Sequence, residues 1–581
     1  MNSAALQHRP ESEDCFLYDA DHLRLRLHAA KGDLQRVTVV YGDPYYALPN
    51  DAGEPVFQYQ TADMTKIGTG ETLDYWAITL TAPYRREQYV FIVTDQDGNT
   101  QLLGDRGLRP DTTQSRMEMS NYFRVPYFHA IDMVQTPDWV KQTVWYQIFP
   151  ERFANGDKTN DPVNTKPWQP ADHPTRDDFY GGDLQGVLDH LDDLQALGVN
   201  GLYFCPIFKA SSNHKYDTID YLEIDPAFGD KALFAKLVAE AHRRGMKIML
   251  DAVFNHMGYE SMQWQDVLAN GAKSRFASWF HIHEFPVAPF RNPNKGEVNP
   301  QYDTFAFESH MPKLNTANPD VQAYLLSVAT YWIKEFDIDA WRLDVANEVD
   351  HHFWRKFHDA VTAVKPDVYV LGEVWHSSQP WLNGDEFSGV MNYAYTQQIL
   401  DHFLTHDQTA SEMTAHLTDQ LMLYRDQTNQ VMLNMLDSHD TARLLTQAGD
   451  NLDLALQTLA FVFMQTGAPC IYYGTEMGMD GGNDPDDRKP MDWTQLGKTT
   501  WQRVATIIKT RRQFAKTLGQ GTTALSVTAS GLVRVERVAD QDLIGYFNTT
   551  DGDVELSCEP LISQGYVDQT LKPNGYVYTQ K

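Results

Sequence analysis

The central part of the chain alternates between segments with helical spacing and short apolar runs. Residues 183–197 place leucine and valine three or four positions apart, which predicts a helix that Gly198 ends before an apolar strand at 201–208. The same order of helix and strand recurs at 230–254 and at 318–344. This repetition predicts parallel strands that are joined by helices.

Further apolar runs bring the number of predicted strands to eight; they lie at 144–149, 368–371, 389–392, 431–436 and 470–473. Eight buried parallel strands with helical connections favour a closed (β/α)8 TIM barrel, and an open doubly wound sheet is the alternative. The long irregular stretch at 258–312 interrupts the barrel after its third strand. Because long loops in compact domains are usually functional, we expect this inserted domain to lie over the barrel mouth.

The segments that flank the barrel have strand periodicity. Short alternating runs at 36–41, 75–80 and 89–94 are separated by turn signals and predict an N-terminal β-sandwich. After residue 505 the sequence predicts a helix and then strands at 532–537 and 543–547, which indicates a C-terminal β-sandwich domain. The expected units are the N-terminal sandwich, the barrel, the domain inserted in it and the C-terminal domain, at 1–135, 136–504, 258–312 and 505–581.

Charge and composition exclude several classes of partner. The 581 residues include 48 Lys and Arg against 78 Asp and Glu, a net charge of −30, which repels nucleic acid and anionic lipid. No run has the length of a signal peptide or a membrane span, so we expect a cytoplasmic protein. The four cysteines lie far apart without metal-type spacing and are expected to be reduced.

Polar residues gather where predicted strands end, which is where barrel enzymes place their active sites. They are Asp251, Asn255 and His256 after the third strand, Arg342 and Asp344 on the fourth, Glu373 after the fifth, and His439 and Asp440 after the seventh. Any one of these alone is more often a structural ion pair or a satisfied polar end. Four polar strand ends in one barrel favour a catalytic site.

Two of these carboxylates have surroundings that predict different roles. Arg342 and Asp344 are two residues apart on one strand and share a face, so the guanidinium can keep the carboxylate ionised and suited to nucleophilic attack. Glu373 precedes Val374 and Trp375, an apolar setting that predicts the raised pKa of a general acid. Glycoside hydrolysis needs such a pair, and a separation of about 5–5.5 Å would mean retention of the anomeric configuration.

Four segments at these strand ends resemble the signature segments of the α-amylase family, in the same order; they are Asp251–His256, Trp341–Asp344, Gly372–Trp375 and Leu436–Asp440. The chain further resembles the neopullulanase, cyclomaltodextrinase and maltogenic amylase group, through Met311–Asn315, Val345–Glu348, Tyr473–Pro485 and, in the sandwich, Tyr41–Pro44. One departure is Asp437, where the group usually has glycine. We expect it to affect neighbouring sugar contacts and to leave the catalytic carboxylates unchanged.

The resemblance implies Asp344 as nucleophile, Glu373 as acid/base and Asp440 as a third carboxylate that holds the hydroxyls of a distorted sugar. It also implies substrate contacts from Arg342, His256 and His439, from Tyr216 beneath the ring, from Asp484 and Arg488 on the non-reducing side, and from Phe305, Val345 and Trp375 on the leaving-group side. The implied reaction is retaining hydrolysis of α-1,4 and some α-1,6 glucosidic bonds in cyclomaltodextrins, maltooligosaccharides, pullulan and starch, with partial transglycosylation.

A loop after the first predicted strand is a candidate calcium site, with oxygen ligands from Asn155, Asp157, Asn160 and Asp161 and closure by Gly181 and Asp183. Calcium binds such mixed carboxylate, amide and carbonyl oxygens. On residue types alone, a turn with self-capping side chains is the more common interpretation. Members of the resembled group carry calcium here, so the resemblance implies a structural Ca²⁺ and no organic cofactor.

Two other functions use the same fold. One is a catalytically inactive glucan-binding scaffold, which the three carboxylates argue against. The other is an isomerase or transglycosylase acting on trehalose or sucrose, which Met311–Asn315 and the N-terminal sandwich argue against. In the resembled group that sandwich reaches a neighbouring subunit, so we also expect a homodimer. The preferred glucan and the product stay open.

Overall fold

The computed structural model describes residues 1–289 and 301–581. Residues 290–300, part of the predicted inserted domain, lie outside the described residues. By compactness the chain divides into two units. One comprises residues 1–135, 406–429 and 523–536, and the other comprises 136–405, 430–522 and 537–581.

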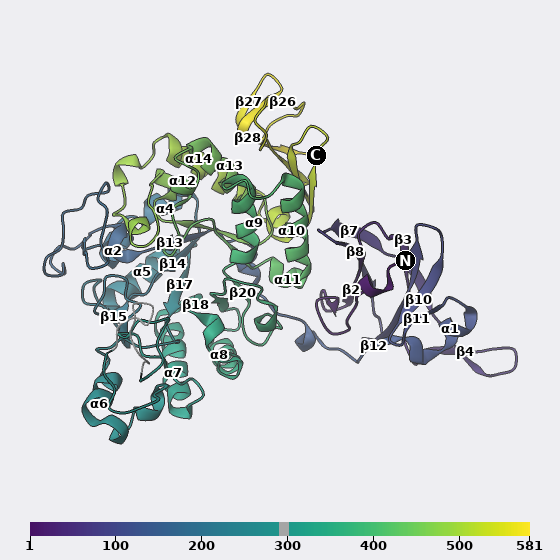
Figure 1. Ribbon diagram of the computed structural model, residues 1–581, viewed down its shortest axis with the longest axis horizontal. Coiled ribbons are helices and arrows are strands. Elements are labelled where there is room, and N and C mark those ends of the chain that lie inside the picture. Colours follow the sequence, from purple (N-terminus) through teal and green to yellow (C-terminus); the bar gives the residue numbers. More distant parts are fainter. Residues whose placement is uncertain (290–300) are drawn as a thin grey trace. The chain divides into compact units, whose positions relative to one another are not determined.

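The second unit contains an eight-stranded parallel sheet that curls into a barrel, surrounded by helices in Figure 1. The strands are β13 (Trp145–Ile148), β14 (Gly201–Phe204), β17 (Lys247–Ala252), β18 (Ala340–Leu343), β19 (Tyr369–Gly372), β20 (Gly389–Val390), β21 (Leu433–Asn434) and β22 (Ala468–Tyr472). Their order is β20-β19-β18-β17-β14-β13-β22-β21, and a parallel bridge between Met391 and Leu433 joins the two edge strands. The predicted TIM barrel is confirmed, and the open sheet is excluded.

The predicted helices form between these strands, with one interruption. Asp230 caps α5 (Lys231–Arg243), and the Asn318 side chain accepts the backbone N–H groups of the first turn of α7 (Pro319–Phe336). The helix predicted at 183–197 is instead two helices, α3 (Leu184–Asp189) and α4 (Leu191–Leu197). The His190 ring between them stacks on Trp493 at 3.5 Å, a distant contact that helical spacing cannot indicate.

The inserted segment is less irregular than the sequence suggests. It contains α6 (Met262–Asn270), which Ser261 caps through a hydrogen bond from the backbone N–H of Trp264. The helix is short and buries few apolar side chains, chiefly Trp264 and Val267, so its periodicity is weak. Near the end of the barrel, α14 (Thr499–Gln513) begins before the predicted boundary at residue 505 and is followed by α15 (Ala515–Gln520).

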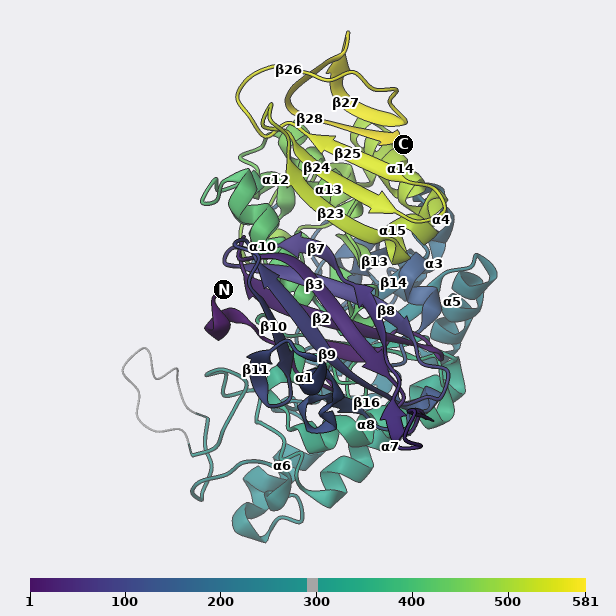
Figure 2. The same cartoon turned by 90° about the vertical axis from the view of Figure 1, so that its right-hand side faces the viewer.

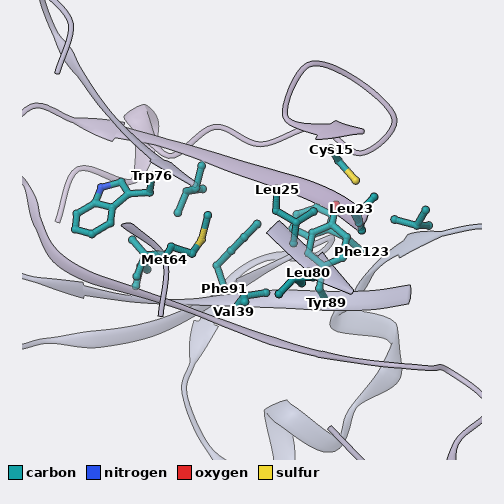
Figure 3. Close-up of a cluster of buried hydrophobic side chains, with 14 of the residues drawn as sticks. Cys15, Leu23, Leu25, Val39, Met64, Trp76, Leu80, Tyr89, Phe91 and Phe123 are labelled. Atoms are coloured by element: carbon teal, nitrogen blue, oxygen red, sulfur yellow. The ribbon is translucent and has the colours of Figure 1, made fainter. Parts of the chain in front are cut away.

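The N-terminal residues form two packed antiparallel sheets. One has the order β1-β2-β8-β7 and the other β11-β10-β9-β3-β6. The bounds are β1 (Cys15–Leu17), β2 (His22–Ala30), β3 (Leu34–Gly42), β6 (Gln60–Asp63), β7 (Thr65–Thr69), β8 (Leu73–Thr81), β9 (Glu87–Asp95), β10 (Thr100–Gly104) and β11 (Gly107–Pro110). Figure 3 shows their shared core, where Leu25 and Leu80 of one sheet lie among Val39 and Phe91 of the other. The predicted sandwich is confirmed.

Residues 406–429 pack on this sandwich within the first unit. Arg26 of β2 is fully buried, donates from Nη1 to the Tyr424 carbonyl at 2.8 Å and forms an ion pair with Asp426. The Tyr75 hydroxyl donates to Asp419 of α10 (Ala410–Met422) at 2.6 Å. These buried polar contacts explain why a segment from the middle of the chain belongs to the N-terminal unit.

The last strands of the second unit form a sheet around one long strand. Strand β28 (Thr570–Gln580) pairs antiparallel with β25 (Leu543–Phe547), β26 (Val554–Glu555) and β27 (Ile562–Val567). Figure 2 shows β25 and β28 side by side in yellow. In the part of the chain that the structure covers, no helix combines the length and apolar character that a bilayer span requires.

Candidate active site

Three neighbouring barrel strands bring two of the predicted catalytic residues, Asp344 and Glu373, together at their carboxyl ends. Asp251 of β17 lies directly opposite Arg342 of β18 in the parallel register. Glu373 directly follows β19, and its backbone N–H donates to the Leu343 carbonyl at 2.9 Å. Asp344, directly after Leu343, donates its N–H to the Ala252 carbonyl at 3.1 Å. The side chains after these strands therefore meet at one edge of the barrel.

The fully buried Arg342 guanidinium binds three carboxylates. Its Nη1 lies 2.7 Å from Asp344 Oδ1 and 2.9 Å from Asp251 Oδ1, and its Nη2 lies 2.8 Å from Glu373 Oε2. Burial raises the pKa of Asp344 and raises that of Asp251 to about 6, and the guanidinium opposes both shifts. The predicted pairing of Arg342 with Asp344 is present, and the same cation also serves two other acids.

The surroundings of Glu373 are more polar than its sequence neighbours suggest. Besides Arg342, its Oε2 accepts the backbone N–H of Val345 at 2.8 Å, and its Oε1 accepts the indole N–H of Trp375 at 3.2 Å. Val345 has a φ of +48°, an uncommon conformation for a β-branched residue. Strained backbone of this kind tends to occur at functional sites, and here it directs an N–H group at a carboxylate.

His439 is held as a neutral donor at the floor of the site. The side-chain amide of Gln147 on β13 lies 2.7 Å from Nδ1, so that this nitrogen accepts and Nε2 carries the proton. The Nε2 atom lies 2.6 Å from the Tyr216 hydroxyl and 3.1 Å from Asp440 Oδ2. Burial holds the pKa of His439 well below its usual value. Gln147 was not among the predicted residues, although a glutamine within a buried strand was an available signal.

Asp440, Arg488 and Asp484 form a second charged group beside His439. Arg488 donates from Nε to the His439 carbonyl at 2.8 Å, and its two terminal nitrogens lie 3.3 Å from Asp440 and 2.9 Å from Asp484. Arg176, another residue that was not predicted, also binds Asp484, at 3.1 Å. These contacts connect the residues assigned to the non-reducing side with the third carboxylate.

A cleft of about 1050 Å³ opens over both groups. Its wall includes every predicted catalytic and substrate-binding residue except Arg342, which lies beneath the carboxylates; the wall contains Tyr216, His256, Phe305, Asp344, Val345, Glu373, Trp375, His439, Asp440, Asp484 and Arg488. The rings of His256 and Phe305 lie 5.3 Å apart, and the inserted segment also contributes residues 306–308. This segment therefore borders the barrel mouth, as predicted.

The candidate calcium loop is ordered by Asp183, which caps α3. The Asp183 carboxylate accepts the backbone N–H groups of Gly156, Asp157 and Gly186 at 2.6–3.1 Å. Gly181 has a φ of +80°, and a Cβ there would lie 2.4 Å from side-chain atoms of Asn155 and Asp161. The loop is thus closed tightly around its own polar side chains.

Two buried oxygens of this loop have no hydrogen-bond donor among the residues that the structure describes; they are Asn155 Oδ1 and Asn160 Oδ1. Such orphaned oxygens fit a cation with hard oxygen ligands. The Asp157 side chain instead accepts from the backbone and hydroxyl of Thr159. Within residues 1–289 and 301–581, no group of three or more His, Cys, Asp or Glu side chains is placed to hold a metal ion. A cation at this loop would therefore depend on amide and backbone oxygens in addition to a neighbouring carboxylate such as that of Asp161.

Comparisons with known proteins agree with this geometry. Residues 147–520 match the α-amylase catalytic domain, and residues 1–129 match the N-terminal Ig-like domain of α-amylases. The chain belongs to the α-amylase family of glycoside hydrolases. The predicted family is confirmed.

Three relatives show how close the α-amylase family resemblance is. An intracellular maltogenic amylase of Bacillus subtilis is 47% identical over 551 residues, which cover 94% of this chain and 91% of that protein. Neopullulanase 2 of Thermoactinomyces vulgaris is 44% identical over 494 residues, 84% of this chain and 81% of that protein. The solved structure of a cyclomaltodextrinase superposes with a TM-score of 0.87 at 41% identity, covering 100% of this chain and 98% of that one.

The buried histidines of this α-amylase family enzyme predict how its stability depends on pH. Burial lowers the pKa of His256 to about 3, against 6.5 for an ordinary histidine, so the unfolded chain binds a proton that the folded chain does not. The stability from the neutral ring is present above pH 6.5 and is lost as the pH falls towards 3. The slope is about 1.4 kcal/mol per pH unit for one proton.

His256→Asn should therefore make the pH dependence of stability shallower between pH 6 and pH 4. Urea midpoints measured across this range for the wild type and the variant give the difference. His352→Gln, a change at an exposed histidine of α8 (His351–Val364), is the control and should leave the slope as it is. An unchanged slope in His256→Asn would show that the ring does not contribute this proton.

Proposed function

We propose that this enzyme hydrolyses α-1,4 and some α-1,6 glucosidic bonds with retention of configuration. The observation that carries the proposal is that Asp344 and Glu373 bind two nitrogens of one guanidinium at the floor of the cleft. One guanidinium keeps the two carboxylates close together, and retaining enzymes place such a pair about 5–5.5 Å apart. Retention proceeds through a covalent glycosyl intermediate.

In this mechanism Asp344 attacks the anomeric carbon and Glu373 protonates the leaving oxygen. Arg342 stabilises the ionised form of Asp344, which the nucleophile requires. The indole N–H of Trp375 and the backbone N–H of Val345 orient the Glu373 carboxyl group. After the leaving group departs, the same carboxylate takes a proton from the water that cleaves the intermediate.

The other cleft residues would hold the sugar. Asp440 and the neutral imidazole of His439 offer an acceptor and a donor to ring hydroxyls, and Tyr216 lies beside them as an aromatic platform. Residues with similar tasks are His256 at the same sugar, Asp484 and Arg488 on the non-reducing side, and Phe305, Val345 and Trp375 on the leaving-group side. Three carboxylates in one open cleft argue against an inactive scaffold.

The names of the relatives support the choice of substrate. They are a maltogenic amylase, a neopullulanase and a cyclomaltodextrinase, and they match this chain over most of its length. We therefore assign cyclomaltodextrins, maltooligosaccharides, pullulan and starch as substrates, with partial transglycosylation. Product profiles on cyclodextrin, pullulan and starch establish the order of preference and show whether maltose or panose is released.

Asp344→Asn and Glu373→Gln should each lower kcat by roughly 10²–10⁴-fold or more while the protein stays folded. Glu373→Gln should recover part of its activity on an aryl α-maltoside, because a good leaving group needs no proton, whereas Asp344→Asn should not. Proton NMR of the first product should show the α-anomer. The control is Asp339→Asn, a buried aspartate that precedes β18 at the opposite end of the barrel. Near-normal turnover in either active-site variant would refute these roles.

The loop at 155–183 is proposed as a structural Ca²⁺ site. The support is the two buried oxygens of Asn155 and Asn160, which have no hydrogen-bond partner among the described residues, together with the neighbouring Asp161 carboxylate. Asp157, Gly181 and Asp183 complete the predicted set, and Asp183 contributes by ordering the loop. Bound calcium would fix this loop against the start of α3, where Asp183 is the cap.

Calorimetric titration of chelator-treated protein with Ca²⁺ should show a single site and a raised melting temperature. Saturation at about 100 times the dissociation constant stabilises the folded state by about 2.7 kcal/mol. Asn160→Ala should abolish both effects, and Asn270→Ala, at an exposed amide, should preserve them. Absence of Ca²⁺ binding by the wild type would remove the site.

The N-terminal sandwich is proposed to mediate a homodimer. Its hairpin of β4 (Ala47–Pro49) and β5 (Pro55–Phe57) presents Tyr45, Tyr46 and Leu48, which are 76%, 46% and 47% exposed. Clustered exposed apolar side chains are typical of interaction surfaces.

We also place the enzyme in the cytoplasm, because the Bacillus subtilis relative is named intracellular and all four cysteines are free thiols; cell fractionation tests this.

Light scattering at micromolar concentration should give twice the chain mass of 66.4 kDa. Tyr45→Ser combined with Leu48→Ser should halve that mass, because the change removes apolar area from the hairpin. Val163→Ser, at a still more exposed apolar residue of the other unit, should leave the mass unchanged. A wild-type monomer under these conditions would defeat the proposal.

A further inference from the structure

Asp437, the residue that departs from the resembled group, joins two active-site loops. It follows β21, is 4% exposed and is not part of the cleft wall. Its Oδ2 accepts the backbone N–H of Leu444 at 2.9 Å and the hydroxyl of Thr475 at 2.8 Å. One carboxylate therefore connects the loop after the seventh barrel strand with the loop after the eighth.

The first of these loops carries the third carboxylate. Residues 437–444 include His439 and Asp440, and Leu444 is the first residue of α12 (Leu444–Gln447). The residue before this helix, Arg443, provides no side-chain cap, so Asp437 supplies the acceptor from the opposite end of the loop. The contact closes the loop on itself and restricts the backbone of Asp440.

The second loop binds the first at further points. Arg443 donates from Nη1 to the Tyr473 carbonyl at 2.7 Å and from its backbone N–H to the Gly481 carbonyl at 3.0 Å. The N–H of Gly481 in turn donates to the Thr446 hydroxyl at 2.8 Å. These contacts, together with the one between Thr475 and Asp437, join the two loops, and we call this set of contacts the seam. At its end, Arg488 contacts Asp440 at 3.3 Å.

The positive charge of Arg443 is buried within this seam. Arg443 is fully buried, and its guanidinium lies 4.6 Å and 4.8 Å from the ring centres of Tyr472 and Tyr473. Burial raises the pKa of Asp437, and the two hydrogen bonds together with the positive charge of Arg443 oppose that rise. Removing the Asp437 carboxylate would leave the backbone N–H of Leu444 and the Thr475 hydroxyl without this acceptor and would take away a negative charge near Arg443, so loss of Asp437 would disturb the whole seam.

We propose that Asp437 is a positioning residue that fixes Asp440 for transition-state binding by holding the two loops together. The inference rests on the proposed role of Asp440 as the third carboxylate. Displacement of a catalytic group by about 1 Å can cost up to 10²-fold in rate. When a group binds the sugar mainly in its distorted form, loss of that group lowers kcat more than it changes KM.

A double-mutant cycle between Asp437 and Asp440 tests the proposal. On an aryl α-maltoside, Asp437→Ala should lower kcat by about 10- to 100-fold with a smaller change in KM. Asp437→Asn should recover part of the loss, because its amide oxygen can still accept from Leu444 and Thr475. In an Asp440→Asn background, Asp437→Ala should cause no further loss of kcat, since its effect passes through Asp440.

Asp339→Ala is the matched control, because it removes a buried aspartate from the opposite end of the barrel. It should lower the melting temperature and leave kcat unchanged, which separates lost stability from lost positioning. Unchanged kcat in Asp437→Ala, or equal losses in the wild-type and Asp440→Asn backgrounds, would overturn the inference. Normal kcat in Asp440→Asn itself would instead overturn the proposed role of the third carboxylate.

Discussion

The Arg342 guanidinium is the interaction on which the active site depends. Three carboxylates, Asp251, Asp344 and Glu373, are buried around it within 2.7–3.0 Å. Burying a carboxylate without a partner costs several kcal/mol, and the acid would take up a proton instead. Arginine suits this position because its planar fork presents donors to several acids at once, whereas the ammonium of lysine is a single point of charge.

The parallel register of the barrel makes this shared cation possible. Asp251 and Arg342 are direct neighbours across β17 and β18, and Glu373 directly follows β19, the next strand of the barrel. A shift of one residue would turn Arg342 to the opposite face of its strand. The surrounding apolar core, which holds residues such as Trp145 and Tyr369, therefore positions the catalytic acids as well as stabilising the fold.

The fold was predictable from sequence to the extent that its signals are local. The eight buried strands appear in the sequence as apolar runs, and capping residues such as Asn318 mark where helices start. Contacts between distant segments leave no such signal, which is why the break at His190 and the weakly periodic helix α6 were not predicted.

For the site, the strand-end acids were visible in sequence, and the resemblance supplied most of their roles. The arrangement around Glu373 was not visible, because its partners Arg342 and Val345 approach it from the neighbouring strand. Gln147 is an intermediate case. A polar residue inside an apolar strand signals a buried hydrogen bond, and only the closed barrel shows that its partner is His439.

The net charge at the cleft accounts for the number of acidic residues that lie there. Five carboxylates, those of Asp251, Asp344, Glu373, Asp440 and Asp484, lie around three guanidiniums, those of Arg342, Arg488 and Arg176, and the buried histidines contribute no charge because their pKa values are lowered. The balance of fixed charge is therefore negative when the carboxylates are ionised. Positive charge develops on the sugar in an oxocarbenium-like transition state, so a preorganised negative site stabilises it more than the neutral substrate. The arginines hold the acids in place, and their smaller number leaves the surplus of negative charge that the reaction uses.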